Sequence, residues 1–133
     1  MPIPILYLNI FRLLKLQDLC TLSELKFCHR LEHNMLPIYF YKNIFIKNSE
    51  THNYLTRGTN NYQLPVFKHS FIKKSIRYRI PQTFNTTLNF LKDKILTHSF
   101  RQFSKITKNH FLESYSDICI IRNCFYLPNI ICP

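Results

Sequence analysis

A short run with four cations, KKSIRYR, begins at Lys73. Lys73 and Lys74 supply point charges, whereas an arginine can hold a phosphate through two parallel N–H bonds. Arg77 and Arg79 are therefore the stronger phosphate ligands, and Tyr78 lies between them. Aromatic rings among cations are typical of surfaces that stack on unpaired bases. The run predicts contact with a phosphate backbone, and a solvated basic strand is the alternative.

The positive charge extends well beyond this run. The chain of 133 residues has 18 Lys and Arg against 7 Asp and Glu, which gives a formal net charge of +11. The only acid between Arg57 and Lys108 is Asp93. This balance favours a polyanionic partner, either nucleic acid or an anionic membrane surface. The residues predicted to bind nucleic acid are Lys73, Lys74, Arg77, Arg79, Arg57, Arg101 and Lys105.

The carboxylates are too scattered to predict a two-metal catalytic site. Such sites need carboxylates that converge on Mg²⁺ within a few ångström, and no D-D, D-x-D or E-x-x-D cluster occurs. Gly58 is the only glycine, which excludes a phosphate-cradling G-x-x-x-x-G-K loop. We therefore predict no catalytic residue, no cofactor and no small-molecule substrate.

Metal binding is the other chemistry that residue spacing suggests. Cys28, His29 and His33 lie close together, and the two histidines are four apart, on one face of a helix. No C-x2-C pair accompanies them, and the later cysteines match no common zinc spacing. We therefore predict histidines on a helix surface, partly buried free thiols and no metal site.

The first element that positions these residues is a helix over 18–32. Its apolar residues recur at spacings of three (Leu19, Leu22, Leu25) and four (Phe27, Leu31), as in an amphipathic helix. Asp18 or Thr21 can cap its start, because both side chains accept a hydrogen bond from a free backbone N–H. Asn34, followed by Pro37, is predicted to end the helix.

Residues 63–80 are predicted to form two strands or a hairpin. Ile76, Tyr78 and Ile80 alternate with the two arginines, which is the period-two pattern of a strand buried on one face. The arginines would then lie on the exposed face, where they can meet a polyanion.

Two further helices are predicted after this β element. The first spans about 81–88, with Pro81 in its first turn, where a missing N–H costs no hydrogen bond. The second spans about 99–112, with a capping box formed by Ser99 and Gln102.

The fold class is therefore mainly α with a small β element (α+β). One small domain is predicted over 1–113, and the tail 114–133 is expected to be extended or disordered. We expect no secretory signal, and since the sequence has no apolar run of 18 residues we predict no membrane span. An intracellular protein with reduced thiols is then the expectation, without distinguishing nucleus from cytoplasm.

Four stretches follow one another in a fixed order: LKFCHRLEHNMLPIYF (25–40), THNYLTRGTNNYQLPV (51–66), KKSIRYRIPQTFNTT (73–87) and SFRQFSKITKNHFL (99–112). Together they resemble the region downstream of the polymerase core in reverse transcriptases of jockey-like non-LTR (LINE-type) retrotransposons. That region contains LKF…LP-x-Y-F, H-x-Y-x-T-R and K-S-(I/L)-R-Y-R-G-P segments, and then a basic helix. The resemblance covers roughly residues 8–116.

The resemblance implies kinship with an RNA-directed DNA polymerase, and the departures limit what it implies. The family's glycine before the proline is Ile80 here, and its tryptophan is Phe84. The pair of palm aspartates that forms the family's active site is absent from the sequence. We therefore expect a truncated fragment that is inert as an enzyme on its own. At most, it binds RNA or single-stranded DNA through a basic face, without sequence preference.

Two alternatives stay open. The chain can be a protein-interaction or structural module that docks through exposed aromatic residues, namely Tyr39, Phe40, Tyr41 and Phe45. It can also be a decayed reading frame without selected function. Exposure of the aromatic group would favour the first of these.

Overall fold

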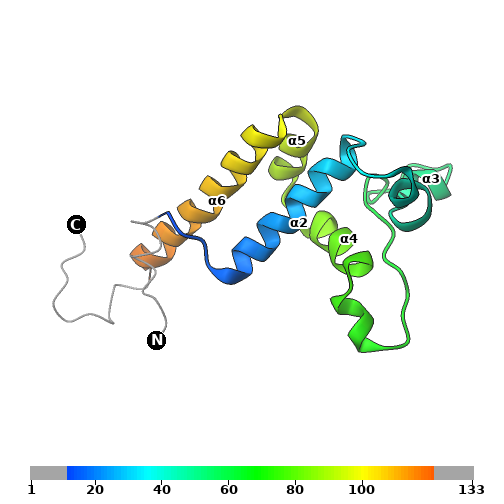
Figure 1. The fold of residues 1–133 in the computed structure, drawn as a ribbon, viewed down its shortest axis with the longest axis horizontal. Helices are drawn as coiled ribbons and strands as arrows, with labels where there is room; N and C mark the ends of the chain where they lie inside the picture. The colour runs from blue at the N-terminus through cyan, green and yellow to red at the C-terminus, as the bar shows by residue number, and fades with distance from the viewer. Residues whose placement is uncertain (1–11, 122–133) are drawn as a thin grey trace.

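The computed structural model describes residues 12–121, with side chains from 12 to 115. Figure 1 shows that this part of the chain is built from helices gathered around α2 (Leu16–Glu32). The prediction of a mainly α fold is therefore confirmed. No helix among the described residues combines the length and the apolar character needed to cross a membrane.

The central helix α2 is in contact with neighbours on several sides. Its buried residues are Leu22, Leu25, Cys28, His29 and Leu31. At 100° per residue these positions cover about half of the helix circumference. That width lets α4 (Ile76–Thr86), α5 (Asn89–Thr97) and α6 (Phe100–Ile121) all pack against α2.

The two ends of α2 differ in how well the sequence predicted them. The helix begins at Leu16, and neither Asp18 nor Thr21 caps it. Its end is confirmed: Asn34 has a φ of 55°, a left-handed conformation that asparagine tolerates better than most residues. The following backbone N–H donates to the carbonyl of Arg30 at 2.9 Å, which completes a Schellman motif.

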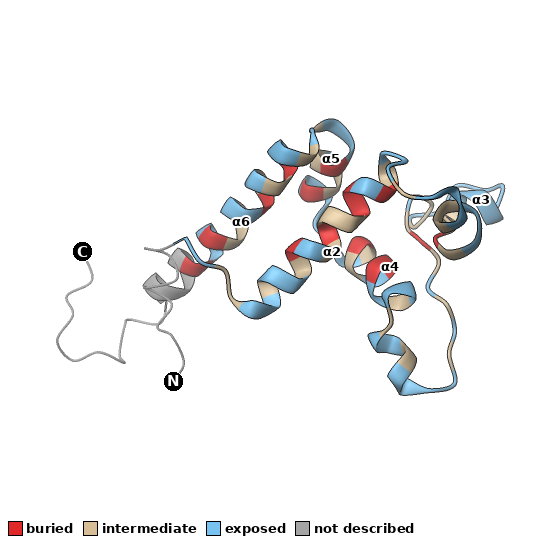
Figure 2. Cartoon of the chain, in the orientation of Figure 1, coloured by how far each residue is buried: buried red, intermediate tan, exposed pale blue. Residues whose placement is uncertain are grey.

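One hydrophobic core lies where these helices meet, and Figure 2 shows its buried residues along α2, α4, α5 and α6. Its members are Leu25, Cys28, Leu31, Phe45, Tyr62, Ile80, Phe84, Ile95 and Phe103. Tyr62 comes from a loop, and its ring meets Phe84 edge to face with centroids 5.0 Å apart. The long connection between α2 and α4 therefore contributes to the core.

The predicted β element is wrong. Over 63–80 the structure has no strand, and the described residues contain only one isolated antiparallel bridge, between Lys47 and Tyr62. Instead, residues 63–69 are irregular, a 3₁₀ turn η2 (Ser70–Lys74) follows, and α4 begins directly after it.

Apolar spacing in this segment fits a helix as well as a strand. In a strand, Ile76 and Ile80 would lie on the same face, because side chains on one face recur every two residues. They are also four residues apart, which is about one turn of a helix. Ile80 and Phe84 enter the core in this helical register, whereas Ile76 is 63% exposed. Pro81 lies inside α4 rather than in its first turn, so it removes one helical hydrogen bond, and its burial in the core offsets that loss.

The last two helices also differ from prediction. The predicted helix over 99–112 is α6, and the side chain of Gln102 accepts a hydrogen bond from the backbone N–H of Ser99 at 3.3 Å. However, α6 continues through 114–121, which was predicted to be extended or disordered, so that prediction is wrong for these residues. The short helix α5 was not predicted. Residues 122–133 of the predicted tail lie outside the described part.

The connection after α2 contains a π-helical turn η1 (Phe40–Ile44) and a short helix α3 (Asn48–Thr51). Tyr39 is 60% exposed, but Phe45 is only 3% exposed and belongs to the core. Phe40 and Tyr41 are half-buried against that core. Only Tyr39 of these four residues is exposed, so they do not form the exposed aromatic group that would favour a protein-interaction module.

Three carboxylates of α2 each hold a different part of the structure. They are Asp18, Glu24 and Glu32. Their partners, in that order, are Tyr115 of α6, Arg79 with Thr83 of α4, and Lys47 with Tyr62 of the long connection. These acids therefore serve internal contacts, and they neutralise little of the charge carried by cations elsewhere on the surface.

Candidate nucleic-acid interface

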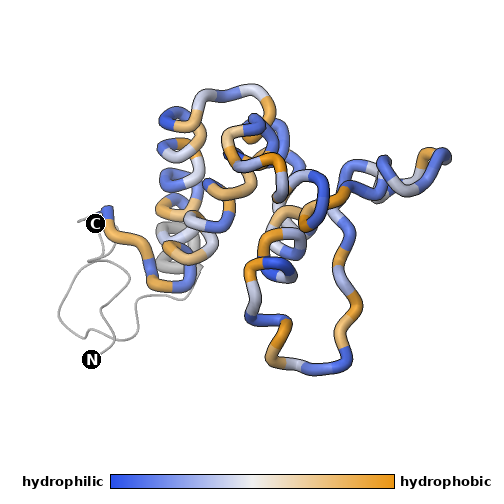
Figure 3. The backbone as a smooth tube through the Cα atoms, turned by 45° about the vertical axis from the view of Figure 1, so that its right-hand side comes forward, coloured by the Kyte–Doolittle hydropathy of each residue, from blue (hydrophilic) through white to orange (hydrophobic). Residues whose placement is uncertain are grey.

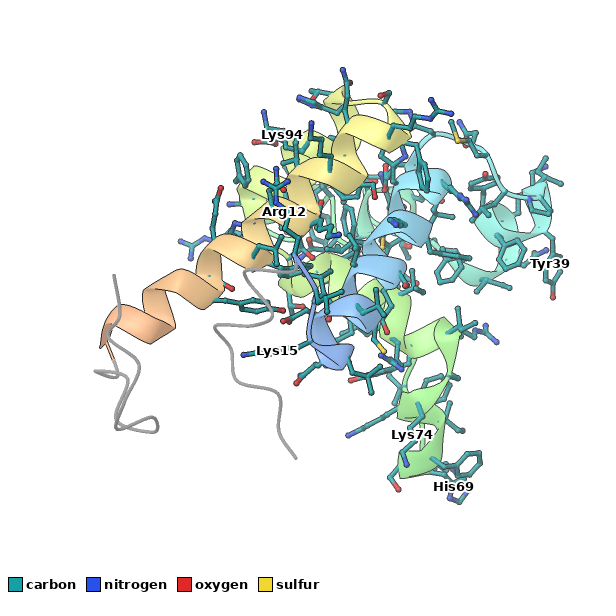
Figure 4. The ribbon with its side chains drawn as sticks, turned by 60° about the vertical axis from the view of Figure 1, so that its left-hand side comes forward. Arg12, Lys15, Tyr39, His69, Lys74 and Lys94 are labelled. Carbon is teal, nitrogen blue, oxygen red and sulfur yellow. The ribbon has the colours of Figure 1, made fainter. Side chains whose placement is uncertain are left out.

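The segment 64–79, here called the basic arm, extends away from the helical bundle. In Figure 1 it descends from the region of α3, turns through η2 and returns into α4. His69 and Lys74 lie at its outer end, away from the bundle (Figure 4). None of its residues is buried, in contrast to the part of α4 that follows. The arm is therefore open to a large partner.

Contacts at its base and its turn support the arm. The rings of Phe67 and Tyr78, one on each side of the arm, pack with centroids 6.1 Å apart. The N–H of Ser75 donates to the carbonyl of Ile72 at 2.9 Å, which closes the turn before α4. Because Ile80 and Phe84 of α4 lie in the core, the second half of the arm leads directly into the bundle.

The arm concentrates positive charge. Its exposed cations include Lys68, Lys73, Lys74 and Arg77, and its sequence contains no acid. Figure 3 shows hydrophilic and hydrophobic residues interleaved along it. Like charges placed this close along the chain repel one another unless an anion lies between them. The arm is therefore suited to a partner that carries several negative charges.

Arg79 has a different role from the other arm cations. It forms an ion pair with Glu24 of α2, and that carboxylate also accepts a hydrogen bond from Thr83. The side chain of Glu24 is 15% exposed, whereas that of Arg79 is 48% exposed. Arg79 therefore ties α4 to α2 at the base of the arm, while Arg77 is exposed and appears in no ion pair among the described residues.

This difference leads to a matched pair of variants. Arg79→Ala should lower the free energy of unfolding by about 0.5–1 kcal/mol, the range of partly exposed ion pairs. Arg77→Ala should change it by less than about 0.5 kcal/mol, as is usual for exposed positions. Urea unfolding followed by circular dichroism measures both. Equal losses in the two variants would show that the ion pair with Glu24 does not stabilise the fold.

The other predicted site residues do not join the arm. Arg57 lies in the exposed loop after α3, and Arg101 and Lys105 lie exposed on α6. In Figure 1, α6 and the arm extend in different directions from α2. The seven predicted residues therefore lie in three places. Four of them, Lys73, Lys74, Arg77 and Arg79, are exposed on the arm, and Arg79 is the one of these four that pairs with Glu24.

The two histidines of α2 serve the fold. Nε2 of His29 lies 2.8 Å from the carbonyl oxygen of His98, and Nε2 of His33 lies 2.8 Å from that of Ile95. Because a carbonyl oxygen only accepts, both Nε2 atoms carry the proton. The pair thus satisfies free carbonyls at the end of α5. His29 is 1% exposed, so its predicted place on a helix surface is wrong.

The thiol next to these histidines is not set up as a ligand or a nucleophile. Burial raises the pKa of the Cys28 thiol to about 12, and the negative charges of Glu32 and Glu24 add to this shift. A neutral thiol is a poor metal ligand and a poor nucleophile. Among the described residues, no group of three His, Cys, Asp or Glu side chains is placed to hold a metal ion.

Sequence reasoning missed part of the arm. It gave no role to His69 or Phe71, although Phe71 is 70% exposed. The pattern K-H-S-F-I-K-K, with rings between cations, was the signal that would have included them. It also missed the ion pair between Glu24 and Arg79.

The arm's charge, exposure and rings are the features that point to a partner. Residues 64–66 and 73–79 of the arm fall within two of the four stretches on which the expected kinship with reverse transcriptases rests, whereas 67–72 lie between those stretches. No protein-family model, curated protein or solved structure matches this chain.

Proposed function

We propose that this chain binds nucleic acid through the basic arm, without sequence preference. One observation carries the proposal: an arm without acids presents five exposed cations, and only Arg79 among them pairs with an acid in the described part of the chain. We also propose that the chain is related to the region that follows the polymerase core of jockey-like non-LTR reverse transcriptases. Nucleic acid is the natural partner of such a region, and this kinship and the arm's charge point the same way.

Binding on this surface is driven by contacts to phosphate. Lys73, Lys74 and Arg77 lie within five residues of one another, on η2 and the first turn of α4. Each contact displaces a condensed counterion, so log K falls by about 0.7 per contact for each unit of log[salt] on a single strand. These contacts carry no sequence information. Affinity should therefore depend strongly on salt and weakly on sequence.

The proposed role is binding rather than catalysis. Phosphoryl transfer needs carboxylates that converge on Mg²⁺, whereas Asp18, Glu24 and Glu32 bind groups of this chain on separate elements. In this proposal the described part of the chain binds and positions a nucleic acid, and it does not itself catalyse a reaction on it.

Two triple variants with the same net charge test the location of the interface. Lys73→Ala/Lys74→Ala/Arg77→Ala removes three arm cations, and Arg101→Ala/Lys105→Ala/Lys108→Ala removes three from α6. The arm variant should reduce the slope of log K against log[salt] by about 2, the sum of three contacts. The α6 variant should reduce it by less than about 1, since only its long-range field changes.

Fluorescence anisotropy with a labelled oligonucleotide, at several salt concentrations between about 50 and 200 mM, measures both slopes. A larger loss in the α6 variant would move the interface to α6 and overturn the assignment to the arm. Absence of binding by the unaltered chain at the lowest salt would overturn the proposed function. Stronger binding to anionic lipid vesicles than to nucleic acid would identify a membrane surface as the partner instead.

A further inference from the structure

Two rings at the outer end of the arm take no part in the core. The rings of His69 and Phe71 stack with centroids 5.9 Å apart and planes inclined by 21°. Phe71 is 70% exposed, and a phenylalanine in a folded chain is ordinarily buried. The large apolar ring of Phe71 is thus exposed to water beside His69, which lies at the outer end of the arm (Figure 4).

The other ring pair of the arm shows the contrast. Phe67 and Tyr78 are half-buried, their planes are tilted by 55°, and they join the two sides of the arm at its base. That pair has an evident structural role. No such role falls to the ring of Phe71, whose only ring contact among the described residues is with His69.

The surroundings of the exposed pair indicate the chemistry of its ligand. Lys68 precedes the rings, and Lys73 and Lys74 follow them, so cations flank the rings along the chain. Phosphates lie between successive bases of a nucleic acid strand, and a flat ring between cations therefore matches a base between phosphates. A duplex hides the faces of its bases, whereas a single strand exposes them.

We propose that the His69–Phe71 pair is a stacking platform for unpaired bases, which makes single-stranded RNA or DNA the preferred partner of the arm. This inference rests on the proposed function, since the same arm must first bind phosphate. It adds the class of nucleic acid and the residue that selects it: Phe71 supplies the stacking surface, and His69 holds the ring in place.

The test compares three probes of equal length, about 12 nucleotides, which suits the usual site size of such surfaces. They are a labelled oligouridine, a duplex of mixed sequence and a strand of the same backbone composed of abasic sites. Phe71→Ala should weaken binding of the oligouridine about tenfold and leave binding of the duplex and the abasic strand unchanged. Phe71→Tyr, which keeps the ring, should bind as the unaltered chain does.

Phe90→Ala is the matched control. Phe90 is also an exposed phenylalanine, at 50%, but it lies on α5, away from the arm (Figure 1). Its removal should leave the affinity for oligouridine within about twofold. Because Phe71 is outside the core, Phe71→Ala should give the far-UV circular dichroism spectrum of the unaltered chain, so a loss of binding will not reflect unfolding.

The outcomes separate this inference from the proposed function. If Phe71→Ala binds oligouridine as tightly as the unaltered chain does, the stacking platform is overturned. This holds even if the triple variant of the arm cations shows the expected smaller slope of log K against log[salt], a result that would still support the proposed function. An equal loss on the abasic strand also overturns it, because the ring would then act without bases. Failure of the unaltered chain to bind any of the three probes overturns the proposed function itself.

Discussion

Phe103→Ala is expected to lower the free energy of unfolding by about 3–5 kcal/mol, the usual cost of deleting a buried phenylalanine ring. Phe103 has no exposed surface, and it joins α6 to the core. Its ring stacks on that of His29 with centroids 5.2 Å apart and planes inclined by 24°. The deletion leaves a cavity between α2 and α6 that rigid neighbours cannot fill.

The size of this loss matters because domains of this length are marginally stable, with total free energies of unfolding of about 5–15 kcal/mol. Urea unfolding followed by far-UV circular dichroism measures the change. Phe90→Ala deletes the same atoms from a half-exposed position on α5 and should cost less than about 1 kcal/mol. Similar losses in the two variants would contradict the packing of α6 on α2 described here.

Stability is also expected to fall steeply with rising pH between about 9 and 12. Burial, with the charges of Glu32 and Glu24, raises the pKa of Cys28 from 9.0 to about 12. Burial and a hydrogen bond to Asp18 raise the pKa of Tyr115 to about 12. Burial and the bond to Glu32 likewise raise the pKa of Tyr62.

The direction of the pH effect follows from which state keeps the proton. Above pH 9 the unfolded chain loses the proton of Cys28 while the folded chain retains it, so unfolding releases a proton and the free energy of unfolding falls. Below pH 9 this contribution is fully present. A shift of three pKa units corresponds to on the order of 4 kcal/mol for this thiol.

A matched pair of cysteine variants tests this prediction. Cys28→Ala removes the buried thiol and should flatten the decline in stability between pH 9 and 12. Cys20→Ala removes a thiol that is exposed, so the decline should remain. Urea unfolding at a series of pH values gives both curves, and a decline in Cys28→Ala as steep as in Cys20→Ala would show that this proton does not stabilise the fold.

The helices that sequence reasoning found are those with unambiguous local signals. In α2, apolar residues at spacings of three and four extend over four turns, and Asn34 provides a left-handed residue at the end. In α6, the polar residues Ser99 and Gln102 mark the start. Such signals lie within a few residues of the element that they define, so one sequence is enough to identify them.

The arm could not be predicted for the opposite reason. The spacing of its apolar residues is compatible with both a strand and a helix. Which of the two forms depends on whether Ile80 and Phe84 can pack in the core formed around α2. Contacts distant in sequence decide this. The same holds for Arg79: its charge is evident from the sequence, but its partner Glu24 is visible only once α4 crosses α2.

The junction at Phe67 and Tyr78 also has an evolutionary consequence. Because their rings are in contact, the chain leaves the bundle and returns to it at nearly the same point. Loops with neighbouring ends can change in length at little entropic cost. The segment between these two rings can thus accumulate substitutions, insertions or deletions while selection preserves the core, so related chains can diverge in what they bind and still share one scaffold.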